Sequence, residues 1–246
     1  MIDIYDKFSI YKKTAIWYNI LLDFQNQDLE ADSLNYNGKK VPAVVIKRLP
    51  RYYRYLAELL KQNITRISSN ALSEKMKVTA SQIRQDFNYF GGFGQQGYGY
   101  NVEYLYTEIG NILGLNEGYT TIIVGAGYLG HAIASHAGFE RRGFKLKGIF
   151  DNDPDKIGSE INGLTVQSTG AMGAFVKENN IDIAILTLPR NAVEETVDEL
   201  VKSGIKGLWN YSYAELKKRD DIAVENVHLS DSLMTLSYKI KQGNDK

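Results

Sequence analysis

The chain has 246 residues, 43% of them hydrophobic and 24% charged, and its 29 basic residues balance 29 acidic ones. This is ordinary globular composition, with room for two small domains. The absence of cysteine excludes disulfides, zinc–cysteine sites and thiol catalysis. No apolar run approaches the roughly 20 residues of a membrane-spanning helix, and Asp3 and Asp6 stand where a secretory signal would be basic. We therefore expect a cytoplasmic protein without a membrane partner.

Residues 1–40 differ from the rest of the chain. Aromatic residues are scattered through their first part, and the stretch DLEADSLNYNGKK that ends them is polar and loop-like. We find no motif there that assigns a partner. We therefore expect residues 1–40 to form a poorly ordered N-terminal extension.

Residues 41–115 have the pattern of a compact helical module. Pro42 is well placed at the beginning of a helix that extends to about Gln62. Pro50 lies within this range and is expected to kink or interrupt the helix early, because proline lacks an amide hydrogen and its ring clashes with the preceding turn.

Two shorter helices follow in this module. Ser68 or Ser69 is positioned to cap the first of them. Thr79 and Gln82 have the spacing of a capping box, in which each side chain bonds the other's backbone amide, and the helix that begins there extends to about Tyr89. A short helix, a turn and a newly capped helix are typical of a helix-turn-helix, whose last helix would recognise DNA.

The charge of the chain is unevenly distributed. The range 41–100 holds nine Lys and Arg residues against three acids. Such an excess on a small module favours a partner with a phosphate backbone. Solvated helix faces would explain it equally well, so charge alone does not decide.

A glycine-rich segment, FGGFGQQGYGY, occupies residues 90–100. It could be a flexible linker, but its interleaved aromatic residues favour a short β-hairpin. Directly after a recognition helix, such a hairpin would be a wing that fits the narrow minor groove. Residues 102–113 are predicted to be helical, and residues 114–118 to link the module to the next domain.

Residues 116–229 begin with a strand, a glycine turn, a helix and a second strand. Thr121–Val124 is a β-branched run suited to a buried parallel strand, and the glycine loop of residues 125–130 follows it directly. Gly125 permits the tight turn, Gly127 lets the backbone approach a pyrophosphate, and Gly130 lets the helix pack on the strand.

The second strand, residues 144–150, ends at Asp151. A carboxylate at this spacing can accept both hydroxyl hydrogens of an adenosine ribose and repels a 2′-phosphate, so NAD(H) is favoured over NADP(H). Arg141 and Arg142 could accept such a phosphate, but they precede the strand and are predicted to lie in a solvated loop.

The remaining pattern continues the alternation of strands and helices. Thr187 and Pro189 follow one buried strand and Asn210 ends another, at the edge where ligands of such sheets bind. Ser230 is expected to cap a final helix. Strands are predicted at 161–166 (a small pair), 181–188, 206–211 and 224–229, and helices at 129–137, 171–179, 191–203 and 231–242.

A nicotinamide-binding domain suggests a dehydrogenase, which needs a substrate domain and a proton donor. The three histidines have neither acid partners nor metal-ligand spacing, and a basic helix-turn-helix stands in place of a substrate domain. We therefore expect a regulator that uses the dinucleotide as an effector, with no metal. The alternatives are an NAD-dependent oxidoreductase with a helical dimerisation arm, and a DNA-binding protein whose nucleotide domain is only a scaffold.

A family resemblance covers about residues 40–241. The segments VPAVVIKRLPRYYRYL, RISSNALSEKMKVTASQIRQDF, YFGGFGQQGYGY, VGAGYLG, HAGFERRGF, FDNDPDKIG, AILTLPR, GIKGLWN and VENVHL, in this order, closely resemble the Rex redox-sensing transcriptional repressors. The resemblance implies an α/β protein with an N-terminal winged helix-turn-helix domain (41–115), a C-terminal Rossmann-like dinucleotide-binding domain (116–229) and a C-terminal helix and tail (230–246) swapped onto the partner of a homodimer. It also implies a repressor that binds palindromic double-stranded DNA operators at low NADH/NAD+ and leaves them when NADH binds.

The resemblance also assigns residues to these tasks. The NAD(H) contacts it implies are Gly125, Ala126, Gly127, Tyr128, Leu129, Gly130, Asp151, Thr187, Pro189 and Asn210. The DNA backbone contacts are Arg48, Arg66, Ser68, Ser69 and Arg84, and the residues that contact bases are Gln85 and Gln96. The family more often has Lys and Arg at these last two positions. Glutamine suits adenine where lysine suits guanine, so we expect a preference for an A·T pair.

A second departure concerns the switch. The family often pairs a Tyr with an Asp across the dimer, where this chain has His136 and His228, and an Arg like Arg54 competes for that Asp. Either Asp231 or another acid substitutes, or the coupling uses a different set of contacts.

Overall fold

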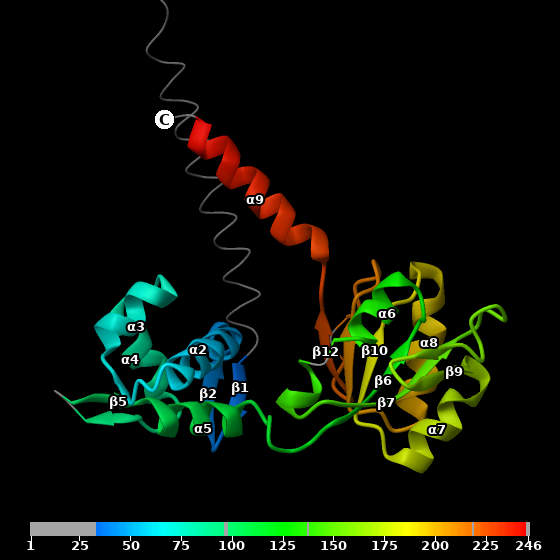
Figure 1. Ribbon diagram of the computed structural model, residues 1–246, viewed down its shortest axis with the longest axis horizontal. Helices are drawn as coiled ribbons and strands as arrows, with labels where there is room; N and C mark the ends of the chain where they lie inside the picture. Colours follow the sequence, from blue (N-terminus) through cyan, green and yellow to red (C-terminus); the bar gives the residue numbers. More distant parts are fainter. Residues whose placement is uncertain (1–32, 96–97, 137, 218, 245–246) are drawn as a thin grey trace, which may run out of the picture. The chain divides into compact units, whose positions relative to one another are not determined.

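The computed structural model describes residues 33–95, 98–136, 138–217 and 219–244 (Figure 1). The chain divides into two compact units, Met1–Gly114 and Leu115–Lys246. Each unit has its own hydrophobic core.

A β-hairpin begins the described part of the N-terminal unit. Strands β1 (Ser33–Tyr36) and β2 (Lys39–Pro42) pair in antiparallel fashion. Asn37 and Gly38 join them with positive φ angles of 48° and 79°, as a tight hairpin turn requires. Tyr36 packs edge-on against Phe90 with ring centroids 5.1 Å apart. In the structure, residues 33–40 of the predicted extension belong to this hairpin, and residues 1–32 lie outside the described residues.

Four helices and a small sheet make up the rest of this unit. The helices are α2 (Ala43–Lys61), α3 (Ser69–Met76), α4 (Ala80–Asn88) and α5 (Val102–Ile112). Strands β3 (Arg66–Ile67), β4 (Gly94–Gln95) and β5 (Gly99–Asn101) form an antiparallel sheet in the order β3-β5-β4. The β4–β5 hairpin stands where the wing is predicted.

Helix α2 continues through Pro50, so the predicted interruption is wrong, while a kink stays a prediction. Pro50 is exposed, while Leu49, Tyr52 and Leu56 on the opposite side are fully buried. Packing of this buried face stabilises the helix more than the missing amide weakens it.

The predicted caps are present, with one exception. The Ser68 hydroxyl accepts a hydrogen bond from the Ala71 amide at 3.1 Å, and Thr79 accepts one from the Gln82 amide at 3.1 Å. The Gln82 side chain donates to Asp86 instead of returning to Thr79. Of the two bonds of the predicted capping box, the described structure therefore shows the one from the Gln82 amide to Thr79.

The C-terminal unit is built on a seven-stranded sheet with the order β12-β11-β10-β6-β7-β9-β8. The strands are β6 (Thr120–Val124), β7 (Lys145–Asp151), β8 (Glu160–Ile161), β9 (Leu164–Ser168), β10 (Ile183–Leu186), β11 (Gly207–Asn210) and β12 (Ala223–Asn226). All are parallel except the edge strand β8. The chain order reverses between β6 and β10, which is the switch point where such sheets bind ligands.

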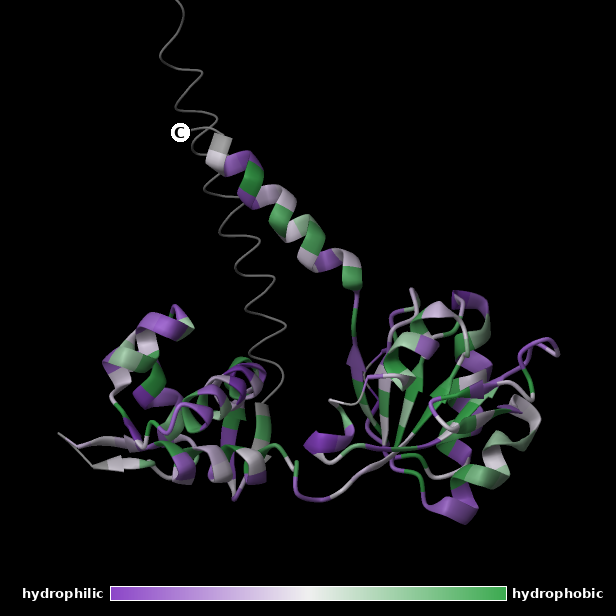
Figure 2. Cartoon of the chain, in the orientation of Figure 1, coloured by the Kyte–Doolittle hydropathy of each residue, from purple (hydrophilic) through white to green (hydrophobic). Residues whose placement is uncertain are grey.

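Helices cover the two faces of this sheet unequally (Figure 1). Helices α7 (Met172–Asn179) and α8 (Val193–Lys202) pack on one face, and the shorter α6 (Tyr128–Ala134) packs on the other. Hydrophobic residues concentrate in the strands between them (Figure 2).

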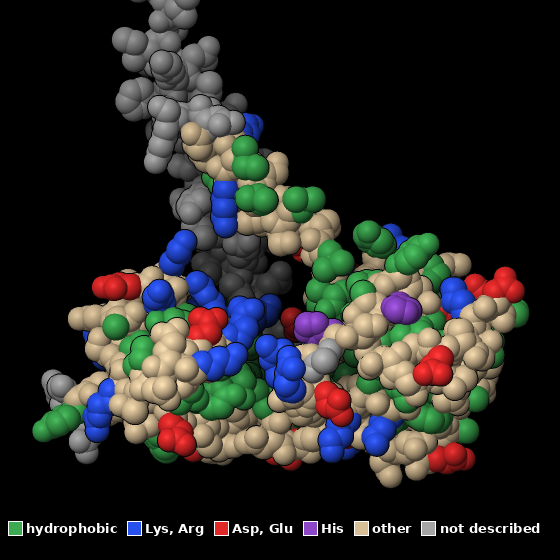
Figure 3. Space-filling model, in the orientation of Figure 1, with side chains coloured by type: hydrophobic (Ala, Val, Ile, Leu, Met, Phe, Trp, Pro, Cys, Tyr) green, Lys and Arg blue, Asp and Glu red, His purple; other side chains and the backbone are tan. Residues whose placement is uncertain are grey.

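The final helix, α9 (Leu229–Asn244), has no buried side chain among those described. Its apolar residues Leu233, Leu236 and Ile240 are 50–66% exposed, and hydrophobic side chains stand out along it in Figure 3. Ser230 lies inside the helix and does not cap it, because the helix already begins at Leu229. None of the helices in the described part of the chain combines the length and apolar character needed to cross a membrane.

Candidate functional site

The glycine loop after β6 is shaped by two internal contacts. Gly125 has a φ of 105°, and a Cβ there would lie 2.7 Å from the Thr187 carbonyl oxygen. A Cβ at Gly130 would overlap the carbonyl oxygen of Gly125. The Thr187 hydroxyl also donates to that carbonyl at 2.7 Å. Turn, helix and neighbouring strand therefore fit together only with glycine at both positions.

Gly127 is different, because nothing in the described structure excludes a side chain from it. Its φ of −75° suits any residue, and a Cβ would meet no atom within 4 Å. Gly127 is the N-cap of α6 and offers no side-chain acceptor to the first-turn amides. The space beside these amides at the start of α6 is open, so a pyrophosphate could approach them closely.

Asp151 ends β7 beside this loop and is nearly buried. Its Oδ2 accepts the Ala126 amide at 2.6 Å and its Oδ1 the Asp153 amide at 2.9 Å, and Lys156 Nζ lies 3.4 Å away. Burial alone would raise the pKa of Asp151, but these amides and Lys156 lower it overall. The carboxylate thus stays charged and bonds the glycine loop, and its contact with a ribose remains a prediction.

Thr187 and Asn210 lie at neighbouring strand ends, but their side chains bond within the protein. Asn210 is fully buried, and its amide donates to the Ala214 carbonyl at 2.6 Å and to Asn226 at 2.8 Å. The Asn210 oxygen accepts from Ser212. Pro189 is exposed just before a turn of 3₁₀ helix. Their predicted contact with the nicotinamide half is not tested by this geometry.

A second candidate surface lies on the N-terminal unit, where Lys and Arg side chains gather (Figure 3). A cavity of about 610 Å³ lies between the start of α3, helix α4 and the base of the wing. Arg84 lines it and donates to the Ser69 hydroxyl at 3.0 Å. Gln85 is exposed on α4, whereas Gln96 lies outside the described residues. Arg66 donates to the Tyr98 carbonyl at 3.3 Å, which ties it to the wing.

Arg48 lies apart from this cavity. Its Nε and Nη2 donate to the two oxygens of Asp86 at 2.7 and 2.6 Å, and Asp86 is fully buried. Sequence reasoning missed Asp86; the available signal was an acid four residues after Gln82, in a module where basic residues outnumber acids. The phosphate contact expected of Arg48 stays a prediction, with two of its donors already used.

The predicted switch residues lie on three separate segments. Arg54 is exposed on α2 and His228 is half-buried just before α9. His136 is exposed after α6, and its ring lies edge-on to Phe139 with centroids 4.7 Å apart. Asp231 is exposed in the first turn of α9. These positions do not test the predicted contacts across a dimer.

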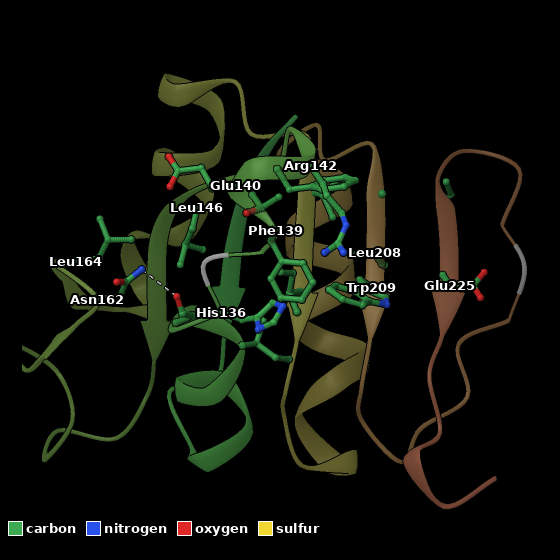
Figure 4. Close-up of a pocket in the computed structure, with 18 of the residues that line it drawn as sticks. His136, Phe139, Glu140, Arg142, Leu146, Asn162, Leu164, Leu208, Trp209 and Glu225 are labelled. Carbon is green, nitrogen blue, oxygen red and sulfur yellow. Dashed lines mark hydrogen bonds between the residues drawn. The ribbon is translucent and has the colours of Figure 1, made fainter. Parts of the chain in front are cut away.

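An open sheet face was also missed by sequence reasoning. A cavity of about 700 Å³ lies over β10, β11 and β12 on the side of α6. Phe139 packs against Trp209 with ring centroids 5.4 Å apart, and Trp209 packs against Tyr211 at 4.8 Å. Figure 4 shows His136, Phe139 and Trp209 together in this cavity, with Glu225 on the neighbouring strand. Of the described helices, α6 and the short 3₁₀ helix Glu140–Arg142 contribute residues to its lining.

Comparison with known proteins assigns the chain to a family. The family model "Putative DNA-binding protein N-terminus" matches residues 40–88, and the model "CoA binding domain" matches residues 116–214. The redox-sensing transcriptional repressor Rex of Thermoanaerobacter pseudethanolicus is 57% identical over 82% of this chain and 91% of its own length. The chain belongs to the Rex family. The Rex repressor of Clostridioides difficile is 53% identical over 84% of this chain and 98% of its own length.

Solved Rex structures agree with this assignment. The repressor RSP in complex with NAD+ and operator DNA is 55% identical, with a TM-score of 0.78, over 83% of this chain and 94% of its own. RSP in complex with NADH gives the same TM-score at 52% identity. As a Rex protein, the chain joins an N-terminal DNA-binding unit to a Rossmann-like unit, and it is a redox-sensing repressor rather than an enzyme. The alternative of an oxidoreductase is thereby set aside.

Proposed function

We propose that this repressor binds palindromic operators at a low NADH/NAD+ ratio and leaves them when NADH binds. The observation that carries the proposal is the open space beside Gly127, at a helix start, in a chain whose helix α4 also exposes Gln85. The relative RSP has been solved with NAD+ and operator DNA together, which supports the same pairing here. A protein of this function works where the DNA is, in the cytoplasm.

The dinucleotide would lie along the switch point of the sheet. The first-turn amides of α6, from Gly127 to Leu129, would hold the pyrophosphate, and Asp151 would bond the adenosine ribose through its remaining lone pairs. Thr187, Pro189 and Asn210 would flank the nicotinamide half, with Thr187 and Asn210 acting mainly by shaping the backbone. The Asp151 carboxylate would oppose a 2′-phosphate, so NADH should bind better than NADPH.

Calorimetric titration of the purified protein tests this site. NADH is expected to bind with at least about tenfold higher affinity than NADPH, because an uncompensated charge next to Asp151 disfavours the phosphate. Equal affinities for the two would contradict the role of Asp151, and no binding of either would contradict the effector site itself.

The DNA surface would combine α4 with the wing. Arg66, Ser68, Ser69 and Arg84 would contact backbone phosphates around the cavity at the start of α3, while Gln85 and Gln96 would contact bases. Two of the Arg48 donors bond Asp86, so in this proposal Arg48 is not among the phosphate contacts.

We also propose a homodimer in which α9 packs on the partner. The apolar side of α9 is exposed in its own chain, and the open sheet face over β10–β12 is apolar. Both surfaces would be covered if each chain received the helix of the other.

Arg54, His136 and His228 would then couple the two units. The Arg54→Ala variant should still bind NADH but should no longer release DNA when NADH binds. Release equal to that of the native protein would exclude Arg54 from the switch.

A further inference from the structure

Asp86 is a fully buried carboxylate in the recognition helix α4, and it accepts four hydrogen bonds. Arg48 Nε at 2.7 Å and the Tyr52 hydroxyl at 2.8 Å donate to Oδ2. Arg48 Nη2 at 2.6 Å and Gln82 Nε2 at 2.9 Å donate to Oδ1. Each oxygen therefore uses both of its lone pairs. We call these four residues the Asp86 clamp.

The clamp joins two helices with directional bonds. Arg48 and Tyr52 are four residues apart in α2 and so present their donors from one face of it. The planar guanidinium can bond both carboxylate oxygens only in a narrow range of orientations. Ile83 and Phe87 also face the core from α4, but apolar contacts are non-directional and tolerate small rotations. The clamp therefore restricts the rotation of α4 about its axis.

This rotation decides where the exposed side of α4 points. Gln85 precedes Asp86 and is exposed, so fixing Asp86 inward fixes the direction of Gln85. Burial raises the pKa of the Tyr52 hydroxyl, and the Asp86 carboxylate raises it further. Tyr52 consequently remains a hydrogen-bond donor across the neutral range.

Stability alone explains such a buried pair poorly. Replacing a buried ion pair by well-packed apolar residues is often neutral or stabilising, because the charges lose their hydration when they are buried. Apolar side chains in place of the pair would not fix the orientation of α4.

We propose that the Asp86 clamp is a positioning device for sequence recognition, and that Arg48 acts through Asp86 and α4 rather than by contacting phosphate. The proposal rests on the proposed function, in which α4 recognises an operator. Arg48, Tyr52, Gln82 and Asp86 are positioning residues in this account, and Gln85 is the residue they position.

The test measures two properties of DNA binding separately: discrimination between DNA sequences, and electrostatic attraction to DNA of any sequence. The probe is a labelled duplex selected from a randomised library by the native full-length protein, and a scrambled duplex of the same composition is its reference. Fluorescence anisotropy gives the ratio of the two dissociation constants, and the scrambled duplex gives the salt dependence. The main variant is Arg48→Met with Tyr52→Phe and Asp86→Leu, which leaves no buried charge. Arg51→Met removes an exposed charge from the same helix and is the control.

We expect the triple variant to unfold well above the assay temperature and to lose at least about tenfold of the discrimination ratio, the size of one mismatched base pair. Its salt slope on the scrambled duplex should equal the native slope, as should that of Arg51→Met. A native discrimination ratio in the folded triple variant would overturn the proposal. So would a salt slope lowered by about 0.9 per lost phosphate contact, since Arg48 would then contact DNA directly.

A milder variant keeps the test decisive if the triple variant does not fold. Tyr52→Phe removes one bond of the clamp and retains the buried ring. It should lower the discrimination ratio measurably with an unchanged salt slope, and a native ratio would overturn the proposal. Failure of the proposed function gives a different result: the native protein would then select no duplex from the library at all.

Discussion

Gly127 and Gly130 show two different reasons for a glycine within one loop. A side chain at Gly130 would overlap the Gly125 carbonyl oxygen, whereas one at Gly127 would meet no atom within 4 Å. The spacing of the loop predicted both roles, because a strand, a turn and a helix are local structure. The partner of Arg48 was not predictable in this way, since Asp86 lies 38 residues further along the chain.

Substitution of these two glycines should separate folding from binding. Gly127→Ala is expected to leave the thermal midpoint unchanged and to weaken NADH binding by about tenfold or more, equivalent to about 1.4 kcal/mol. Gly130→Ala should lower the free energy of unfolding by about 1–3 kcal/mol or more, because the added methyl group overlaps backbone. Calorimetric titration and thermal unfolding measure the two effects. Native NADH affinity in Gly127→Ala would place the pyrophosphate elsewhere.

Gln85 is the residue on which base preference should depend. Glutamine can bond the N6 and N7 atoms of adenine, whereas lysine bonds the acceptors of guanine. Gln85→Lys should therefore shift the preference at one base pair of each half-site from A·T to G·C, by about 1–3 kcal/mol. Binding-site selection with the native protein and the variant checks this. An unchanged preference at every position would show that Gln85 does not contact a base.

At the scale of elements, alternating strands and helices were predictable from hydrophobic runs and caps, and the differences arise from packing. The sequence pattern around Pro50 predicts a break, but the buried side of α2 keeps the helix continuous. The turn residues Asn37 and Gly38 signal a hairpin, whereas the contact of Tyr36 with the distant Phe90 is not local and could not be predicted from the turn. The open sheet face over β10–β12 could not be predicted, because it depends on which face each helix covers.

Asp182 joins the amino ends of three strands and should make the C-terminal unit sensitive to acid. It accepts bonds from the Thr120 amide at 2.9 Å and Lys206 at 2.7 Å. Burial alone would raise the pKa of Asp182, but these partners lower it below its ordinary value of 3.8. Because the folded-state pKa lies below the unfolded one, this stabilisation is present above about pH 4 and is lost as the pH falls through the folded-state pKa.

Asp182→Asn should accordingly lower the free energy of unfolding at neutral pH by about 1.5–3 kcal/mol, the range for a bond to a charged group. The difference from the native protein should shrink as the pH falls below about 4. Thermal unfolding across this range checks it, with the exposed Glu178→Gln on α7 as control. A difference that stays constant with pH would contradict the charged role of Asp182.

At the scale of the whole molecule, α9 carries an apolar surface that no part of the described chain covers. The resemblance to Rex proteins, rather than any pattern in the helix itself, predicted that a partner covers it. Leu233→Asp with Leu236→Asp should convert a dimer into a monomer, because both side chains would be buried against the partner. Sedimentation velocity would then give the 27.7 kDa of one chain, while the control Ser232→Asp should give twice that mass. A dimer that survives the double substitution would place the interface away from α9.

A redox switch further requires that NADH bind one arrangement of the proposed dimer better than the other, since equal affinity shifts no equilibrium. A nearly complete change of state needs about 5.5 kcal/mol of differential binding. Two recognition helices about 34–36 Å apart, the spacing of successive major grooves, would lose their fit to DNA if the halves of the dimer rotated. NADH would thus act on the geometry of the dimer and leave α4 itself unchanged.

The most direct measurement is the fluorescence anisotropy of a labelled, library-selected duplex bound to the native protein, titrated with NADH, NAD+ and NADPH at one fixed salt concentration. We expect NADH to release the DNA at concentrations at which NAD+ and NADPH leave it bound. Tight binding that none of the three dinucleotides changes would contradict the switch, and would leave a DNA-binding protein whose Rossmann-like unit is only a scaffold.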